Sequence, residues 1–259
     1  MPSYPVSQLG LALWPRANAR PKGNFEQSVA RSSLRRVETK EFLFTEGDPV
    51  THVFRVETGA IALYKVLADG RRQIMDFAYP SDFIGLGARG EHLMNAQAVK
   101  PTRLRCLPIG TFRQCASRDP IIGSKVYEAL VGELAASRDH TLTICRRSAI
   151  ERVVGFLLVC SRRNGQKGKD PSRIDLPMTR ADIGDFLGLT TETVSRTFTK
   201  LRARSLIEFP CQSQVKLVDL EELETLTEGE KKVLDGRRKT REMRQDLRRN
   251  SSQGSVIGI

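Results

Sequence analysis

The chain lacks any long run of apolar residues. Over its 259 residues, no stretch approaches the roughly 18 consecutive apolar residues that a membrane-spanning helix needs. The apolar patch at residues 9–14 lies between Pro5 and Pro15 and is too short for the core of a secretory signal. We therefore expect no membrane partner and a cytoplasmic location.

Cysteine and histidine are sparse and scattered. The nearest pair of cysteines is nine residues apart, which excludes a Cys-x-x-Cys motif and argues against a disulfide framework. The three histidines have no spacing such as His-x-x-x-His that would place two metal ligands on one helix face. We expect reduced thiols and no metal site. Redox control through a low-pKa thiol stays open for Cys160 and Cys211, which lie on either side of two predicted helices at 180–187 and 191–204.

Motifs of known enzyme classes are also missing. The chain has no Gly-rich phosphate loop, no Gly-x-Ser-x-Gly nucleophile elbow and no His-Glu-x-x-His motif, so we predict that it is not an enzyme. It does have positive charge, with 42 Lys and Arg against 30 Asp and Glu and a net +12. This balance favours a polyanionic partner, but the excess is spread along the chain and marks no binding face.

Short runs of β-forming residues fill the segment from about 38 to 110. Ala60–Val66 leads to Asp69-Gly70, which predicts a tight hairpin turn because Gly tolerates a positive φ. Repeated short strands with turn signals favour a β-sandwich or barrel. The predicted divisions of the chain are a disordered arm at 1–30, a β-barrel domain at 31–118, a long helix at 119–148, a second domain at 149–225 and a charged tail at 226–259.

An apolar stripe at helical spacing begins after Pro120 and continues for about 27 residues without another proline. A helix of this length needs a partner surface along its whole extent. Packing on its own barrel and pairing with a second copy of the chain are both compatible with the pattern. The candidate dimer-interface residues are Val126, Leu130, Leu134 and Leu142.

Two close-set helices are predicted at 180–187 and 191–204. Thr179 is placed to cap the first helix, Gly188 supplies a tight turn, and Thr190 is placed to cap the second. Gly184 permits a close approach of the two helices. This is the pattern of a helix-turn-helix, and the alternative is an ordinary helical hairpin with a solvated charged face.

The outward face of the second helix carries the candidate DNA-binding residues. An Arg there can bridge guanine O6 and N7 in the major groove, and a Glu can accept from cytosine N4. Residues 190–206 hold four basic residues and one acid, a local +3 where phosphates would lie. The candidates are Thr190, Thr191, Glu192, Ser195, Arg196 and Lys200.

Three segments resemble the Crp/Fnr family of bacterial transcription regulators, and within it the Fnr/FixK branch. They are Phe44-Thr-Glu-Gly-Asp48, the apolar helix Ala149-Ile-Glu-Arg-Val-Val-Gly-Phe-Leu157, and Glu192-Thr-Val-Ser-Arg196, which matches the branch's Glu-x-x-Ser-Arg signature. The resemblance covers roughly residues 38–223. It implies an α+β chain with an N-terminal cyclic-nucleotide-binding-type β-barrel (jelly roll), a long dimerisation helix and a C-terminal winged helix-turn-helix.

The resemblance also implies a function. A homodimer would place its recognition helices on half-sites roughly 34 Å apart on double-stranded DNA. The branch binds palindromes of the TTGA-N6-TCAA type, with Arg196 on the guanine, Glu192 on the cytosine side and Ser195 on a thymine. RNA polymerase is the implied partner, and activation of oxygen-limitation genes is the implied outcome.

Departures from the family concern the sensor. The first cysteine is Cys106, so the cysteine group that holds an iron–sulfur cluster ahead of the barrel is missing. In the loop that binds cyclic AMP in related proteins, the phosphate-binding Arg and its Ser neighbour are replaced here by Met94 and Asn95, and Met cannot neutralise a phosphate. Arg89 and Glu91 are the remaining effector-loop candidates. We expect no cofactor; the alternative is a barrel that binds an unidentified effector such as a cyclic nucleotide or haem.

Overall fold

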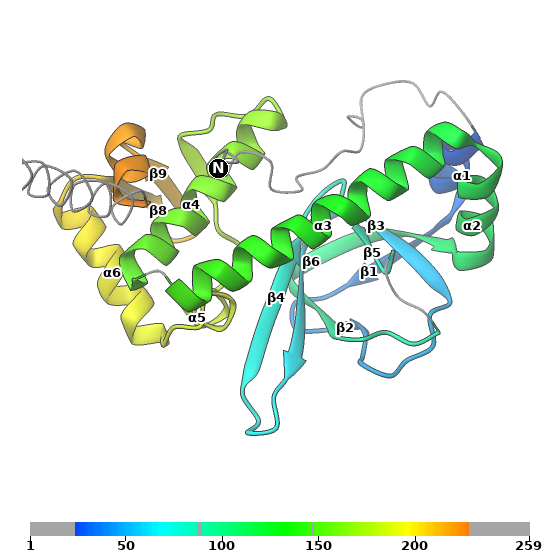
Figure 1. The fold of residues 1–259 in the computed structure, drawn as a ribbon, viewed down its shortest axis with the longest axis horizontal. Coiled ribbons are helices and arrows are strands. Elements are labelled where there is room, and N and C mark those ends of the chain that lie inside the picture. The colour runs from blue at the N-terminus through cyan, green and yellow to red at the C-terminus, as the bar shows by residue number, and fades with distance from the viewer. Residues whose placement is uncertain (1–23, 87–89, 147, 228–259) are drawn as a thin grey trace, which may run out of the picture.

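The computed structural model describes residues 24–86, 90–146 and 148–227. Its N-terminal part is an antiparallel six-stranded sheet with the order β1-β6-β3-β4, to which β2 and β5 add through β6 and β3 (Figure 1). The strands are β1 (Ser33–Val37), β2 (Phe42–Phe44), β3 (His52–Val66), β4 (Arg72–Ala78), β5 (Phe83–Ile84) and β6 (Asn95–Pro108). The sheet curls around its own apolar core, as the alternating strand pattern predicts.

The β3–β4 hairpin turns at the predicted place. Val66 is opposite Arg72, and Gly70 adopts a φ of +82° in the connection. β3 is one 15-residue strand, although Gly59 within it suggests two shorter strands. Gly59 has a φ of +99°, and a Cβ there would lie 2.2 Å from Thr102 Oγ1, so only glycine lets β3 bend against β6 at this point.

Helices close one end of the barrel. α1 (Asn24–Arg31) buries Phe25 and Val29, one helical turn apart, against α2 (Ile109–Arg118) and the strands. The predicted disordered arm at 1–30 is therefore too long at its C-terminal end, because residues 24–30 belong to this helix. The remainder of the predicted arm lies outside the described residues.

A 27-residue helix, α3 (Pro120–Arg146), runs from α2 along the barrel to the C-terminal domain (Figure 1). Several of its large apolar side chains are exposed in the single chain. The α4 helix (Ala149–Gln166) follows and begins with a capping box between Ser148 and Glu151. None of the described helices is long and apolar enough to cross a membrane.

In the described residues the C-terminal domain combines α4, two shorter helices and a final helical segment with a small sheet. β7 (Arg173–Asp175), β9 (Gln214–Leu217) and β8 (Ile207–Cys211) form the sheet in that order, beside α5 (Arg180–Leu187) and α6 (Thr191–Ala203). The residues at 220–227 are helical, and Leu223 in this segment is buried in the domain core. The rest of the predicted charged tail lies outside the described residues.

Candidate nucleic-acid interface

The first helix of the predicted helix-turn-helix is capped at both ends. The Thr179 hydroxyl accepts from the backbone N–H of Asp182, and the Asp182 carboxylate accepts from the Thr179 backbone N–H at 2.9 Å. This reciprocal pair is the capping box that the sequence predicts. At the other end Gly188 takes a left-handed conformation with φ +63°, which ends the helix at the predicted turn.

A close approach of the chain to itself determines the geometry of the turn. A Cβ on Gly184 would lie 2.6 Å from the carbonyl oxygen of Leu189, so no larger residue fits there without displacing backbone. The Leu189 N–H in turn donates to the Gly184 carbonyl at 2.9 Å. Thr190 then caps α6 by accepting from the Thr193 N–H at 3.2 Å. The two helices are thus held at a defined angle by local contacts.

The two faces of α6 differ as predicted. Val194, Phe198 and Leu201 are buried in the domain core, and each is no more than 2% exposed. The six candidate DNA-binding residues are all exposed, on the opposite side: Thr190, Thr191, Glu192, Ser195, Arg196 and Lys200. The structure therefore brings them together on one surface at the start and along the outer face of the helix.

The two proposed base-reading side chains contact each other in the free protein. Arg196 Nη2 donates to Glu192 Oε1 at 2.6 Å, and both side chains are more than 70% exposed. The Ser195 hydroxyl donates to the Thr191 carbonyl, one turn earlier. Glu192 and Arg196 therefore lie next to one another on the exposed face of α6.

The surrounding charges modify the local +3 predicted from composition. Arg204 pairs with Glu222 at 2.7 Å, so part of its charge is neutralised within the domain. Lys200 is exposed and makes no ion pair with any described residue. The Arg180 guanidinium lies 3.7 Å over the Phe198 ring, which fixes α5 against α6 by a cation–π contact. Lys200 is therefore a better candidate than Arg204 for a contact with a DNA phosphate.

The candidate dimer residues on α3 fall into two groups. Leu130, Leu134 and Leu142 are exposed in the single chain, by 36%, 52% and 57%. Val126 is half-buried and packs against the apolar cluster of α1, α2 and the barrel instead. Tyr127 and Val131, which are 69% and 47% exposed, join the first group and were not among the sequence candidates. Tyr127 lies three residues before Leu130, and Val131 lies three residues before Leu134, and this spacing of about one turn was the available signal.

The effector-loop candidates do not form a charged cradle. Asn95 accepts from the Glu46 N–H and donates to the Tyr64 carbonyl, which is a structural role within the barrel. Glu91 is exposed and Met94 is half-buried. Arg89 lies outside the described residues. The described effector-loop candidates, Glu91, Met94 and Asn95, therefore provide no positive charge that could hold a phosphate.

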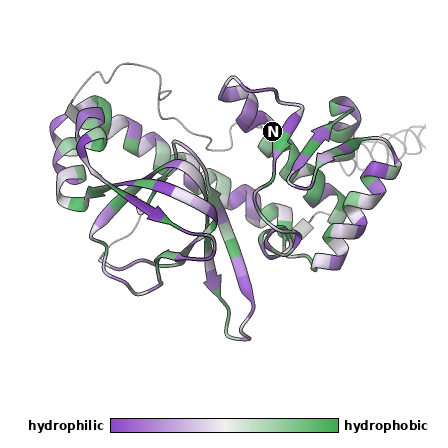
Figure 2. Ribbon diagram, turned by 180° about the vertical axis from the view of Figure 1, so that it is seen from behind, coloured by the Kyte–Doolittle hydropathy of each residue, from purple (hydrophilic) through white to green (hydrophobic). Residues whose placement is uncertain are grey.

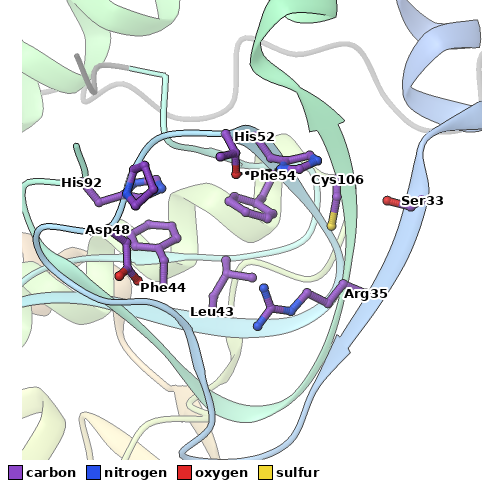
Figure 3. Close-up of a pocket in the computed structure, with 11 residues that line it drawn as sticks. Ser33, Arg35, Leu43, Phe44, Asp48, His52, Phe54, His92 and Cys106 are labelled. Atoms are coloured by element: carbon purple, nitrogen blue, oxygen red, sulfur yellow. Dashed lines mark hydrogen bonds between the residues drawn. The ribbon is translucent and has the colours of Figure 1, made fainter. Parts of the chain in front are cut away.

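A hollow of about 420 Å³ opens on the barrel, and neither Glu91, Met94 nor Asn95 lines it (Figure 3). Its floor is aromatic, with the buried His92 ring stacked 3.5 Å from the Phe44 ring, centroid to centroid. Burial lowers the pKa of His92, so the ring is neutral at pH 7. No group of three or more His, Cys, Asp or Glu in the described ranges is arranged to hold a metal ion.

Comparisons with known proteins agree with this architecture. Residues 34–119 match the cyclic nucleotide-binding domain family, and residues 151–226 match the Crp-like helix-turn-helix domain family. The nitrogen fixation regulation protein FixK of Bradyrhizobium diazoefficiens is 35% identical over 226 residues, which cover 80% of this chain and 95% of FixK. The transcriptional activator protein FnrL of Cereibacter sphaeroides is 31% identical over 181 residues, covering 68% of this chain and 73% of FnrL.

A solved structure, that of FixK2 from Bradyrhizobium japonicum, shares 35% identity and a TM-score of 0.71, and the match covers 75% of this chain and 96% of FixK2. The predicted fold is confirmed: a cyclic-nucleotide-binding-type β domain, a long helix and a C-terminal helix-turn-helix domain. The relatives are transcription regulators rather than enzymes. The chain therefore belongs to the Crp/Fnr family of transcription regulators, in which the helix-turn-helix binds DNA.

Proposed function

We propose that the protein is a homodimer that binds a palindrome of the TTGA-N6-TCAA type and activates transcription through RNA polymerase in the cytoplasm. The observation that carries the proposal is the exposed group Glu192, Ser195 and Arg196 on the first two turns of α6. The N-terminal turns of a recognition helix are the part that enters the major groove. An Arg beside a Glu suits a guanine followed by a base pair that presents a cytosine amino group.

The dimer is supported by the exposed apolar side chains of α3. Tyr127, Leu130, Val131 and Leu134 recur at three- and four-residue steps, and each is at least 36% exposed in the single chain. Such a stripe is typical of a two-helix seam, in which each side chain packs between those of the facing helix. A second copy of α3 would cover the stripe and remove its apolar surface from water.

Activation without a bound cofactor is the third element of the proposal. It is supported by Met94 and Asn95 at the phosphate-binding positions of the family's nucleotide loop, where neither side chain carries a positive charge. Control would then come from the amount of the protein or from another protein.

Equilibrium binding to the palindrome tests the DNA part of the proposal. Purified protein should bind the palindrome at least a hundredfold more tightly than a scrambled duplex at the same salt concentration, since specific affinities exceed non-specific ones by roughly 10³–10⁷. Equal affinity for both duplexes would refute sequence-specific binding. Adding cyclic AMP should leave the affinity unchanged, and a gain of about tenfold or more would show that the barrel is a nucleotide receptor.

Sedimentation of Leu134→Glu tests the dimer. A carboxylate placed at the centre of the apolar seam should dissociate the dimer, because two such charges would face each other without water. Glu128→Lys, an exposed change on the same helix at a position about 120° around the helix axis from Leu134, is the matched control and should remain dimeric. If both variants sediment like the unaltered protein, the seam lies elsewhere.

A second candidate function is favoured by the hollow in the barrel. The Arg35 side chain reaches this hollow beside the aromatic floor (Figure 3), which suits a small anionic effector with an apolar ring. A rise in melting temperature with such a compound, which is lost in Arg35→Ala, would support this alternative.

A further inference from the structure

The barrel contacts the first helix of the helix-turn-helix through the start of β4, next to the turn of the β3–β4 hairpin. Arg72 Nη2 donates to Asp182 Oδ1 at 2.7 Å and to Asp185 Oδ2 at 2.8 Å, and Arg72 Nε donates to the same Asp185 oxygen at 3.1 Å. The Arg72 guanidinium also lies 5.2 Å from the centre of the Tyr64 ring on β3. One barrel side chain thus binds two carboxylates on one face of α5. Figure 1 shows α5 beside β4.

The neighbouring residue completes the end of the same helix. The Gln73 side-chain amide donates to the Asp185 carbonyl at 2.7 Å and to the Phe186 carbonyl at 3.4 Å. The last four carbonyl groups of a helix have no partner within it, and α5 ends at Leu187. The Leu187 carbonyl accepts from Arg152 on α4. Two of the orphan carbonyls just ahead of the turn to α6 are therefore satisfied by the barrel.

Apolar contacts lie beneath these polar ones. The Phe186 ring of α5 lies 5.4 Å from Phe77 on β4 and 4.3 Å from His140 on α3. Ile74 and Phe77 belong to the same continuous buried cluster as the core of the C-terminal domain. Seen from behind in Figure 2, the barrel and this domain meet where the β3–β4 hairpin and α3 come together. Barrel, long helix and helix-turn-helix are therefore packed as one unit at this point.

We propose that Arg72 and Gln73 are positioning residues for DNA recognition, which hold α5, and with it α6, at one orientation relative to the barrel. The proposal rests on the dimeric function proposed above. Within each subunit, α6 is fixed to α5 by the close contact of Gly184 with Leu189. If α5 is fixed to the barrel and α3 pairs with α3 of the second subunit, the distance between the two copies of α6 is fixed as well. Arg72 and Gln73 would thereby select the spacing between half-sites.

Remaining contacts would keep the domain attached without Arg72. Arg163 on α4 pairs with Asp82, and Lys167 Nζ donates to the Pro80 carbonyl at 2.6 Å. Both lie on the α4 side of the interface, away from α5. Loss of Arg72 would remove the ion pair of both Asp182 and Asp185, which lie one turn apart on α5, where like charges repel; among the described residues, Asp182 would keep only its capping bonds from Thr179. The helix-turn-helix would then adopt a range of orientations, and DNA binding would have to select one of them.

Binding to palindromes with spacers of five, six and seven base pairs tests the proposal. Arg72→Ala should weaken binding to the palindrome with the six-base-pair spacer by about tenfold, as expected for loss of a charge-assisted contact that organises the site. The ratio of this affinity to the affinities for the five- and seven-base-pair spacers should also fall. Arg71→Ala is the matched control, because Arg71 is the adjacent arginine and carries the same charge. Among the described residues its ion-pair partner is Asp69 within the hairpin, and its side chain is 78% exposed. This variant should retain both affinity and spacer preference within about twofold. Equal behaviour of the two variants would overturn the proposal.

Two further variants guard against a folding defect. Arg72→Lys keeps the charge but loses the planar fork that reaches both carboxylates, so it should show a partial loss of spacer preference at an unchanged melting temperature. Exchanging the partners, Arg72→Asp with Asp185→Arg, should restore part of the preference that Arg72→Asp alone removes; no recovery would count against the pairing. If the unaltered protein binds palindrome and scrambled DNA equally, the proposed function itself fails, and this result is distinct from a loss of spacing alone.

Discussion

Removal of the Arg196 side chain tests the base-reading role most directly. In the free protein its guanidinium pairs with Glu192 at 2.6 Å, with the side chains 74% and 71% exposed. An exposed pair one helical turn apart is worth about 0.3–0.5 kcal/mol, and the protein gives up part of this when Arg196 turns to a base. A bidentate contact to guanine contributes about 1–3 kcal/mol. Arg196→Ala should therefore cost about 0.5–2.7 kcal/mol of binding free energy for each half-site of the palindrome.

The loss should be specific to one base pair. Fluorescence anisotropy can measure binding to three duplexes: the palindrome, a palindrome in which the guanine is replaced by adenine, and random DNA. Together they separate recognition of the guanine from non-specific binding. Arg196→Ala should bind the first two duplexes with nearly equal affinity, because the variant no longer discriminates at that position. Its melting temperature should stay unchanged, since the residue is exposed and contributes little to the core.

Lys200→Ala supplies the contrast. Lys200 is exposed and has no ion-pair partner among the described residues, so its expected contact is with a phosphate. The substitution should weaken binding to all duplexes alike and reduce the slope of log affinity against log salt by about 1 for each subunit, or about 2 for the proposed dimer. If both variants lose specific and random DNA to the same extent, the reasoning about Arg196 is refuted.

Three further predictions concern the architecture. Gly184→Ala should lower the free energy of unfolding in urea by about 1–3 kcal/mol, because its Cβ would meet the Leu189 carbonyl oxygen at 2.6 Å; an unchanged midpoint would contradict the tight turn. Burial lowers the pKa of His140, so the unfolded chain binds a proton more readily than the folded protein does. The free energy of unfolding should therefore fall as the pH drops below about 6.5, and His140→Phe should make this fall smaller. Burial raises the pKa of Cys160 to about 12, so iodoacetamide at pH 8 should label the exposed Cys211 and leave Cys160 unmodified, as mass spectrometry of peptides would show.

Local signals in the sequence predicted the helix-turn-helix closely. Thr179, Gly188 and Thr190 mark its caps and turn through side-chain and backbone preferences that act within three or four residues. The C-terminal end of α4 was harder to predict from the sequence. The polar residues after Cys160 suggest a loop, yet the helix continues to Gln166. Contacts from Arg163 and Lys167 to the barrel hold these last turns, and no local pattern encodes them.

The sequence by itself determined the β-domain, the long helix and the face of α6 that carries Glu192 and Arg196, because hydrophobic periodicity and capping are local properties of the chain. Only the tertiary structure decided which side of α3 is free, burying Val126 against the barrel while leaving Leu134 exposed. It alone also brought Arg72 to Asp185, residues 113 positions apart. Such a contact depends on how two domains pack, and neither residue's neighbours in the sequence reveal it.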